Sequence, residues 1–350
     1  MELFNLGKVD WAESQLIYHA LADQGREALC LVSPASPYVC IGYHQDVDQE
    51  IDLEFCQARS IPVFRRELGG GAVYLDGDQL FFQLILKRNN PKVPLHREVF
   101  FRKFLQPIIN VYQRIGIPAV YKPVNDVLAG TRKISGTGVG EIGDCIVFVG
   151  NLIADFNYQM MSHILKVPDE KFRDRVHQTI EAGLSTIRRE LGDGEAARWD
   201  EATLNKMMAE EFGAVVGELT PADWDEALRA GIEKRKKWMF SHEWLHRKGR
   251  RIKGREVKVR AGVRVIHRMH KAPGGLIRAV YELNEGRIKD LNFSGDFFVY
   301  PHDGLTRLEA ALEGKTPAEL DQAIEAFYRR GRIETPGLGP EDWLAVLPEE

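Results

Sequence analysis

Apolar and polar residues follow two kinds of pattern along this chain. Short runs rich in Val, Ile and Phe indicate strands, and apolar residues repeated every three or four positions indicate helices. The second pattern predicts helices at 50–59 and 96–116, the latter kinked or broken at Pro107. The first pattern predicts strands at 28–33 and 38–43, which we expect to pair with each other, and also at 80–87 and 145–156.

The pattern changes near residue 240. Helical spacing at 169–191, 197–212 and 221–237 gives way to strand-like runs at 254–267, 275–283 and 287–298. A further helix is expected to begin at Pro317, because Thr316 can cap it and Glu319 can reach back to the cap. We therefore predict an α/β (α+β) protein with a mixed-sheet domain over residues 1–240 and a small α+β domain over residues 241–350.

Composition narrows the class of protein. The 350 residues are 44% hydrophobic and 28% charged, which is typical of a globular protein with a substantial core. The formal net charge of −4 argues against general attraction to nucleic acid or to an anionic membrane. The start of the chain has no signal-peptide pattern, and no apolar run is long enough to span a bilayer. Together with four scattered cysteines, these features predict a cytoplasmic protein with no membrane partner.

A run of three glycines follows two arginines in the segment RRELGGGAVYLDGDQL, residues 65–80. Glycines 69 to 71 permit positive φ and close approach of a ligand to bare backbone. Arg65 and Arg66 supply permanent positive charge, and a guanidinium binds a phosphate or a carboxylate through two parallel hydrogen bonds. The segment therefore indicates an anion-binding turn. The alternative is a glycine-rich bulge with solvated arginines.

A second polar segment, NDVLAGTRKISG, spans residues 125–136. Asn125 and Asp126 offer oxygen ligands suited to Mg²⁺, and Lys133 lies just before the small residues Ser135 and Gly136. The segment is not a P-loop, because the lysine does not follow the second glycine of a GxxxxGK[ST] pattern. A lone lysine is usually a surface residue, so the hypothesis for Lys133 depends on its neighbours.

These segments occur in a recognisable order: YVCIGYHQ (38–45), RRELGGGAVYLDGDQL (65–80), NDVLAGTRKISG (125–136) and FVGNLIADF (148–156). Together they resemble the lipoate–protein ligase family, whose catalytic domain is shared with biotin ligases and octanoyl transferases. The stretch after residue 240, especially GRIKDLNFSGDFF, is similar to the small accessory domain of bacterial lipoate ligases. The resemblance implies a biotin/lipoate ligase-like catalytic domain followed by that accessory domain.

The resemblance also implies a reaction and a set of site residues. Lipoate would attack the α-phosphate of ATP to give lipoyl-AMP, and a lysine of an acceptor protein would then take the lipoyl group. Lys133 would be the catalytic residue, contacting both the acyl group and the phosphate, with Mg²⁺ held by Asn125 and Asp126. The nucleotide would lie against Arg66, Gly71, Ala72, Val73 and Tyr74, and lipoate against Gly69, Gly70, Ser135 and Gly136. Apolar candidates for the slot that takes the lipoyl tail are Tyr38, Ile41, Phe82 and Leu84.

Three kinds of acceptor fit the resemblance: glycine cleavage H protein, the acyltransferase subunits of oxo-acid dehydrogenases, and a specialised lipoate-binding protein. The sequence departs from the family at residues 75–78, where a histidine is usual, near Gln83, where a serine is frequent, and in TGVGEIGDC after Gly136. These departures concern the fit of the acyl chain and the nucleotide, and they leave the charged residues of the expected reaction centre unchanged.

Two other functions stay open. In the related octanoyl and lipoyl transferases, which act without ATP, a cysteine nucleophile lies just before the segment that corresponds to residues 131–136. Here that stretch, AVYKPVNDVLAG (119–130), has no cysteine, and Cys145 is expected to be buried and inert. A nucleic-acid-binding protein could use residues 246–271, which hold eleven Lys or Arg against one Glu. We favour docking of an acidic acceptor protein for that basic stretch.

Overall fold

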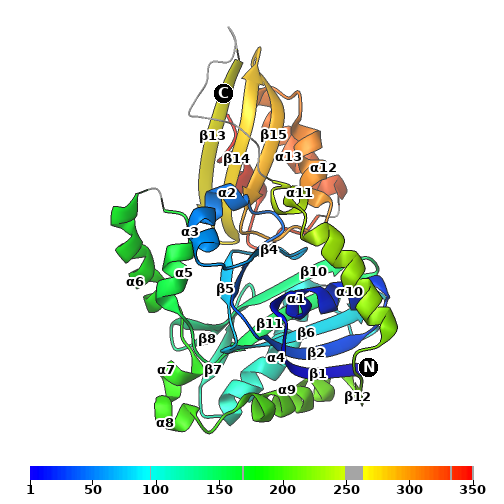
Figure 1. Cartoon of the computed structure of the whole chain (residues 1–350). Helices are drawn as coiled ribbons and strands as arrows, with labels where there is room; N and C mark the ends of the chain where they lie inside the picture. The colour runs from blue at the N-terminus through cyan, green and yellow to red at the C-terminus, as the bar shows by residue number, and fades with distance from the viewer. Residues whose placement is uncertain (95, 168, 249–262, 332, 349–350) are drawn as a thin grey trace. The chain divides into compact units, whose positions relative to one another are not determined.

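The computed structural model describes residues 1–94, 96–167, 169–248, 263–331 and 333–348. The chain divides into two compact units. The first unit comprises residues 1–40, 51–66 and 73–245, and the second comprises residues 41–50, 67–72 and 246–350. Residues 67–72, which we call the glycine segment, therefore belong to the second unit. Figure 1 shows the elements of both units along the chain.

The first unit is built on a six-stranded sheet with the order β10-β11-β6-β2-β1-β12. β1 pairs in parallel with β2 and β12, whereas the pairs β2–β6, β6–β11 and β11–β10 are antiparallel. The predicted mixed α/β fold is thus confirmed. The bounds of these strands are β1 (Glu2–Val9), β2 (Ala28–Pro34), β6 (Gln79–Lys87), β10 (Thr137–Ile142), β11 (Cys145–Ile153) and β12 (Thr220–Pro221).

Two pairs of helices pack against this sheet. α1 (Trp11–Asp23) packs on α10 (Glu226–Met239) and on β2, and α4 (Arg97–Arg114) packs on α9 (Glu201–Val216). The helix predicted at 96–116 is confirmed, and it continues through Pro107 without a break. α1 is buried along most of its length, with Leu16 and Ile17 inaccessible to solvent.

Two small sheets complete the strands of the first unit. One has the order β4-β3-β5 and the other β7-β8-β9. The predicted pairing of 28–33 with 38–43 is wrong, since β2 pairs with β1 and β6 while β3 pairs with β4 and β5. A strand pattern depends on local residues, but the partner depends on which faces meet in the folded chain. The bounds are β3 (Tyr38–Ile41), β4 (Val63–Arg65), β5 (Val73–Leu75), β7 (Ala119–Lys122), β8 (Asp126–Ala129) and β9 (Arg132–Ser135).

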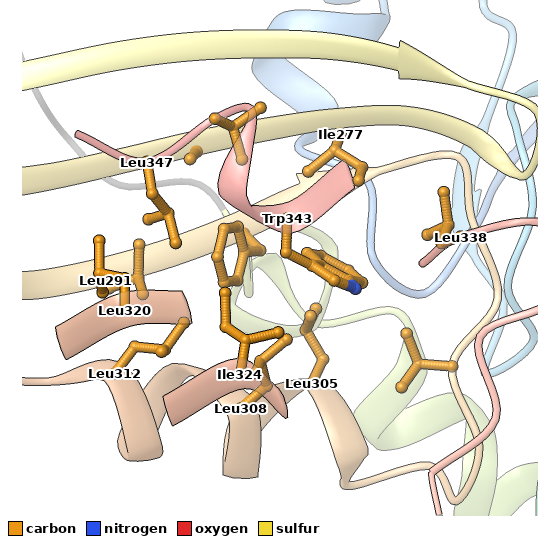
Figure 2. Packing of buried hydrophobic residues seen from close by; sticks show 14 of the residues in the cluster. Ile277, Leu291, Leu305, Leu308, Leu312, Leu320, Ile324, Leu338, Trp343 and Leu347 are labelled. Carbon is orange, nitrogen blue, oxygen red and sulfur yellow. The ribbon is translucent and has the colours of Figure 1, made fainter. Parts of the chain in front are cut away.

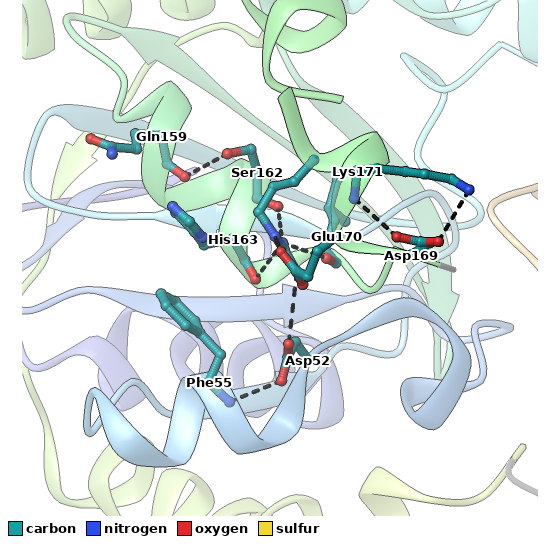
Figure 3. Close-up of polar contacts among 10 residues, drawn as sticks. Asp52, Phe55, Gln159, Ser162, His163, Asp169, Glu170 and Lys171 are labelled. Atoms are coloured by element: carbon teal, nitrogen blue, oxygen red, sulfur yellow. Dashed lines mark hydrogen bonds and ion pairs between the residues drawn. The ribbon is translucent and has the colours of Figure 1, made fainter. Parts of the chain in front are cut away.

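A buried arginine joins the shorter helices of the first unit. Arg173 donates to the carbonyl oxygens of Ser162 and His163 at 2.7 and 3.1 Å and forms an ion pair with Glu170 at 2.6 Å. Figure 3 shows these three partner residues together with Asp52. Its guanidinium also lies 4.0 Å from Asp52, the N-cap of α3. The helices in this region are α3 (Leu53–Ala58), α5 (Tyr158–Ile164), the 3₁₀ turn Glu170–Phe172, α6 (Arg173–Gly183), α7 (Ile187–Leu191), α8 (Asp193–Ala196) and α11 (His242–Leu245).

The second unit has its own core between a three-stranded antiparallel sheet and three helices. Trp343 is inaccessible to solvent and its ring lies 5.0 Å from Phe293 and 5.3 Å from Phe297, among aliphatic side chains (Figure 2). The predicted reach of Glu319 back to Thr316 is confirmed, because the N–H and the hydroxyl of Thr316 donate to the Glu319 carboxylate at 2.9 and 2.8 Å. The elements are α2 (Val47–Glu50), β13 (Val263–Ala272), β14 (Gly275–Asn284), β15 (Arg287–Gly295), α12 (Gly304–Leu312), α13 (Pro317–Gly331) and α14 (Pro340–Leu344).

Candidate active site

Lys133 lies on a β-hairpin of the first unit. β8 and β9 pair with Leu128 opposite Lys133, and Gly130 in the intervening turn has a φ of +58°. The Lys133 Nζ is 2.7 Å from the Asp126 carboxylate at the start of β8, and both side chains are about one-third exposed, 37% and 30%. The hairpin therefore brings together the predicted catalytic lysine and one predicted metal ligand as an ion pair.

The backbone of β9 is held from two sides. The Lys133 carbonyl oxygen accepts a 2.8 Å hydrogen bond from Ser185 N–H. The buried Tyr112 hydroxyl donates to the Ile134 carbonyl at 2.6 Å and accepts from Ile153 N–H at 3.1 Å. Because burial disfavours the phenolate, the pKa of Tyr112 is raised and the hydroxyl keeps its proton. These contacts fix the strand that presents Lys133, while the lysine side chain stays partly accessible.

A chain of hydrogen bonds continues from the hairpin to β5. Gly136 N–H donates to Asn151 Oδ1 at 2.9 Å, Asn151 Nδ2 donates to Gln79 Oε1 at 2.9 Å, and Gln79 donates to the Tyr74 carbonyl at 3.1 Å. Ser135 is fully buried, and its hydroxyl donates to the Asn151 carbonyl at 2.7 Å. The network thus links the predicted lipoate-binding residues Ser135 and Gly136 to the predicted nucleotide-binding residue Tyr74.

Asn151 and Gln79 were not among the predicted site residues. Asn151 lies in the segment FVGNLIADF, so a polar residue inside an otherwise apolar strand was the available signal. The neighbouring Gly150 is also required locally, because a Cβ there would lie 2.5 Å from the Phe82 ring and 2.9 Å from the Gly136 oxygen. This strand therefore supports the lysine hairpin by close backbone approach as well as by the Asn151 amide.

Asn125 and Asp126 fit the predicted metal role only in part. Asn125 donates its amide to the Thr137 carbonyl at 3.0 Å, and Asp126 is paired with Lys133. Among the described residues, no group of three or more His, Cys, Asp or Glu side chains could hold a metal ion. A magnesium ion here would take one carboxylate from the protein and complete its shell with water and phosphate oxygens, which is the usual arrangement for Mg²⁺.

The two adjacent arginines have different environments. Arg65 is inaccessible to solvent, and its guanidinium donates to the carbonyl oxygens of Trp244 and Leu245 at 3.1 and 2.6 Å. The Trp244 indole returns a 2.9 Å hydrogen bond to the Arg65 carbonyl. Arg65 therefore anchors the end of the first unit, because residues 244–245, far away in sequence, accept hydrogen bonds from its guanidinium.

Arg66 is partly exposed and lies beside a buried cysteine. Its guanidinium is 3.4 Å from the Cys40 carbonyl oxygen and 3.5 Å from the Cys40 sulfur. Burial raises the pKa of the Cys40 thiol, and the positive charge of Arg66 opposes that shift. Of the two arginines, Arg66 is the one whose exposure allows a ligand to approach.

The glycine segment is packed against other residues of the second unit. Gly70 has a φ of +90°, and its N–H donates to the Phe297 carbonyl at 3.3 Å. A Cβ at Gly69 would lie 2.8 Å from that same oxygen and 2.8 Å from the Phe298 ring. Gly71 has more room, since its nearest neighbour would be Asp296 at 3.5 Å. Gly70 is thus buried, whereas Gly69, Gly71 and Ala72 are partly exposed, although a side chain at Gly69 would collide with residues 297–298.

The four residues expected to line an apolar slot, Tyr38, Ile41, Phe82 and Leu84, are all fully buried. Two buried glutamine side chains, Gln15 and Gln83, also lie in this region and form hydrogen bonds. Gln15 donates to the Tyr38 hydroxyl at 2.6 Å, and Gln83 donates to the Ser14 carbonyl at 2.6 Å. The Gln83 Oε1 atom is buried without a hydrogen-bond partner among the described residues.

Cysteine chemistry has little support in the structure. Cys145 lies at the start of β11 and is fully buried, and burial raises the pKa of its thiol. The other three cysteines are also buried and form no disulfide bond. A thiolate nucleophile needs exposure and a lowered pKa, so Cys145 has the character of a core residue.

The basic stretch 246–271 is described only in part, because residues 249–262 lie outside the described residues. Lys248 is buried and binds Glu309 at 3.0 Å and the Phe293 carbonyl at 3.1 Å. His246 lies 3.1 Å from Asp48. These two side chains therefore hold the second unit together. Within the described ranges, no helix combines the length and apolarity needed to cross a bilayer.

The family model of the lipoyl protein ligase A/B catalytic domain matches residues 8–213. Lipoate–protein ligase 1 of Staphylococcus aureus is 25% identical over 278 residues, which cover 79% of this chain and 78% of that protein. Lipoate-protein ligase A subunit 2 of Thermoplasma acidophilum is 46% identical over 77 residues, which cover 22% of this chain and 81% of that subunit.

Solved structures show the same fold. P. falciparum LipL1 in complex with lipoate has a TM-score of 0.70 at 16% identity and covers 95% of each chain. The bipartite lipoate protein ligase of T. acidophilum, solved with its E2 lipoyl domain, has a TM-score of 0.63 at 21% identity, covering 72% of this chain and 98% of that one. Lipoate-protein ligase A bound with ATP has a TM-score of 0.58 at 19% identity, covering 70% and 98%.

Proposed function

The chain belongs to the lipoyl protein ligase A/B catalytic-domain family, and from this premise we propose that it is an ATP-dependent lipoate–protein ligase. It activates lipoate to lipoyl-AMP and transfers the lipoyl group to a specific lysine of an acceptor protein. The observation that carries this proposal is the hairpin on which Lys133 lies beside Asp126, with a backbone held by Tyr112 and Ser185 and an amine that remains accessible.

Lys133 is the catalytic residue in this proposal. Negative charge gathers on the α-phosphate oxygens as the lipoate carboxylate attacks, and a fixed ammonium stabilises that charge at little reorganisation cost. In the ligand-free protein Asp126 neutralises the amine at 2.7 Å. When a phosphate arrives, it competes with Asp126 for the same amine.

We assign the remaining site residues by the family resemblance and by their exposure. The nucleotide would contact Arg66 and the stretch from Gly71 through Ala72 and Val73 to Tyr74, of which all but Tyr74 are partly exposed. Lipoate would contact Gly69, Gly70 and Gly136, together with the backbone at Ser135, whose hydroxyl is already bonded to Asn151. Gly69 is partly exposed, and its lack of a Cβ, which would collide with residues 297–298, keeps the backbone there bare.

A magnesium ion is the metal implied by the reaction with ATP. Asp126 would hold it, with Asn125 beside it, and its chemistry would be to neutralise phosphate charge. The Asp126 carboxylate would then leave the Lys133 amine, which frees the amine for the acyl phosphate group. The residues fit a metal that is shared with the nucleotide.

The proposed domains are a catalytic domain over residues 1–240 and an accessory domain over residues 241–350. A relative whose ligase is formed by two separate chains, as the T. acidophilum protein is described, supports this division. The acceptor is proposed to be a lipoyl domain: H protein, an oxo-acid dehydrogenase acyltransferase, or a specialised lipoate-binding protein. The E2 lipoyl domain named with the T. acidophilum ligase supports this class of partner.

The test is pyrophosphate release from ATP with lipoate, comparing wild type with Lys133→Ala. We expect release by the wild-type chain and a loss of about 100-fold or more in the variant, because one charge-stabilising group of a reaction centre has been removed. Lys206→Ala on α9, an exposed lysine, is the matched control and should leave the rate unchanged. A transferase acting without ATP would release no pyrophosphate in any of these proteins.

A further inference from the structure

Two exposed aromatic side chains mark the end of α10 in the first unit. Trp238 is 47% exposed and Phe240 is 40% exposed, and both belong to the few large hydrophobic side chains that reach solvent in the described structure. A tryptophan left half in solvent forgoes a large amount of apolar burial, because an aromatic side chain can bury 150 Å² or more, by order of magnitude. We call the surface formed by Lys234, Lys236, Lys237, Trp238 and Phe240 the α10 patch.

The rings of the α10 patch are held by other aromatic residues of the same unit. The Trp238 ring lies 4.0 Å from Trp244, and the Phe240 ring stacks on Trp11 at 5.3 Å with an interplanar angle of 5°. Trp11 in turn lies 5.3 Å from Tyr38 on β3. The aromatic contacts therefore hold the rings of the patch in place. Through Trp11 and Tyr38 these contacts reach the small sheet β4-β3-β5, whose strands β4 and β5 flank residues 66–72.

Lysines surround these rings on the helix. Each exposed ring follows an exposed lysine by four positions, as Trp238 follows Lys234 and Phe240 follows Lys236, and such pairs share a helix face. Lys236 lies 3.9 Å from Glu233, but Lys234 and Lys237 form no ion pair with another described residue. Arg235 points to the other side and binds Asp23. The patch is thus basic as well as aromatic.

We propose that the α10 patch is the surface on which the acceptor protein docks, through an acidic face of that protein. This inference rests on the proposed function and names the part of the chain that binds its protein substrate. The exposed lysines Lys234 and Lys237 favour a partner of negative charge, and complementary charge of this kind speeds encounter and fixes orientation. The preheld tryptophan supplies the central apolar anchor that specific protein contacts need.

The basic stretch 246–271 was the surface predicted for this role from the sequence. Its described members include Lys248, which is buried and bound to Glu309, so that lysine cannot meet a partner in this conformation. Other described residues of the stretch, Lys271 and Met269, are exposed, but only the α10 patch combines exposed lysines with two exposed aromatic side chains among the described residues of these two surfaces.

The test measures acylation of the T. acidophilum E2 lipoyl domain as a function of its concentration. Variants are Trp238→Ser and the double change Lys234→Glu with Lys237→Glu. The control is Lys206→Glu with Arg102→Glu, two exposed basic residues on α9 and α4. We expect the KM for the lipoyl domain to rise about 10-fold in the charge variant and about 5-fold in Trp238→Ser, with kcat little changed. The difference between wild type and charge variant should shrink as salt is raised.

Pyrophosphate release from ATP and lipoate without acceptor is measured on the same proteins and should be equal in all of them. If that release is absent in wild type, the proposed function fails. If release is normal and the KM for the lipoyl domain is the same in patch and control variants, the docking proposal alone is overturned. It is also overturned if Trp238→Ser instead abolishes a dimer seen in solution, or if the patch variants lose only binding to anionic lipid vesicles.

Discussion

The lysine hairpin and the glycine segment were both predicted to bind the same ligand, yet they are built differently. The hairpin is held by side chains, with Ser135, Asn151 and Gln79 forming a continuous hydrogen-bonded network under an accessible lysine. The glycine segment is held by backbone, with Gly69 and Gly70 against the Phe297 carbonyl and Gly70 against Gly42. The hairpin is thus positioned by side-chain hydrogen bonds, whereas the glycine segment is positioned by close backbone contacts that leave no room for side chains at Gly42 and Gly69.

This difference indicates that the two regions contribute in different ways. The hairpin supplies a charge whose position depends on a buried scaffold, so ligand should change it little beyond releasing Asp126. In the glycine segment Gly70 is buried, whereas Gly69, Gly71 and Ala72 are partly exposed, so we expect a ligand to contact the exposed backbone of these three residues.

Arg65 is where the largest effect on stability is expected. Arg65→Met removes donors from the buried carbonyl oxygens of Trp244 and Leu245 and should lower the unfolding free energy by about 3 kcal/mol. Chemical denaturation of the full chain measures this loss. Arg66→Met is the matched control, which we expect to change stability little and to reduce pyrophosphate release. If Arg66→Met lowers stability while Arg65→Met lowers only pyrophosphate release, Arg65 is the arginine that contacts the ligand.

Gly69 provides a sharper test of the backbone-packed region. Gly69→Ala places a methyl 2.8 Å from the Phe297 oxygen and should cost about 2 kcal/mol of stability through overpacking. Gly71→Ala meets only an ordinary contact at 3.5 Å and should be tolerated by the fold. Thermal unfolding of both variants measures this difference, and Gly69→Ala should have the lower melting temperature. Equal melting temperatures would show that the glycine segment is not packed as described.

Replacement of Asn151 tests the hydrogen-bond network that supports the lysine hairpin, and we expect a smaller loss of stability than at Arg65 or Gly69. Asn151→Ala leaves Gly136 N–H and Gln79 without their partner and should cost roughly 1.5 kcal/mol. Pyrophosphate release should also fall, because the backbone after Lys133 loses a support. Asn110→Ala on α4, whose amide binds Glu211 on the helix surface, is the control. If Asn151→Ala unfolds normally and keeps full activity, the network does not position the lysine.

The sequence predicted the positions of helices and strands better than it predicted which strands pair. The apolar runs of β2, β6 and β11 and the spacing of α4 were sufficient to locate these elements, because each pattern is local. The pairing of β2 and β3 was wrong because the partner of a strand depends on tertiary contacts. Arg65 and Arg66 differ for the same reason, since only the folded chain brings Trp244 and Leu245 to Arg65.

The central claim is that the Lys133 amine contacts the acyl phosphate linkage of a lipoyl adenylate. A crystal structure with a non-hydrolysable lipoyl-adenylate analogue tests it most directly. We predict that Lys133 Nζ leaves Asp126 and lies at hydrogen-bond distance, about 3 Å, from the linkage. If Lys133 remains paired with Asp126 while the analogue binds elsewhere, the claim is contradicted.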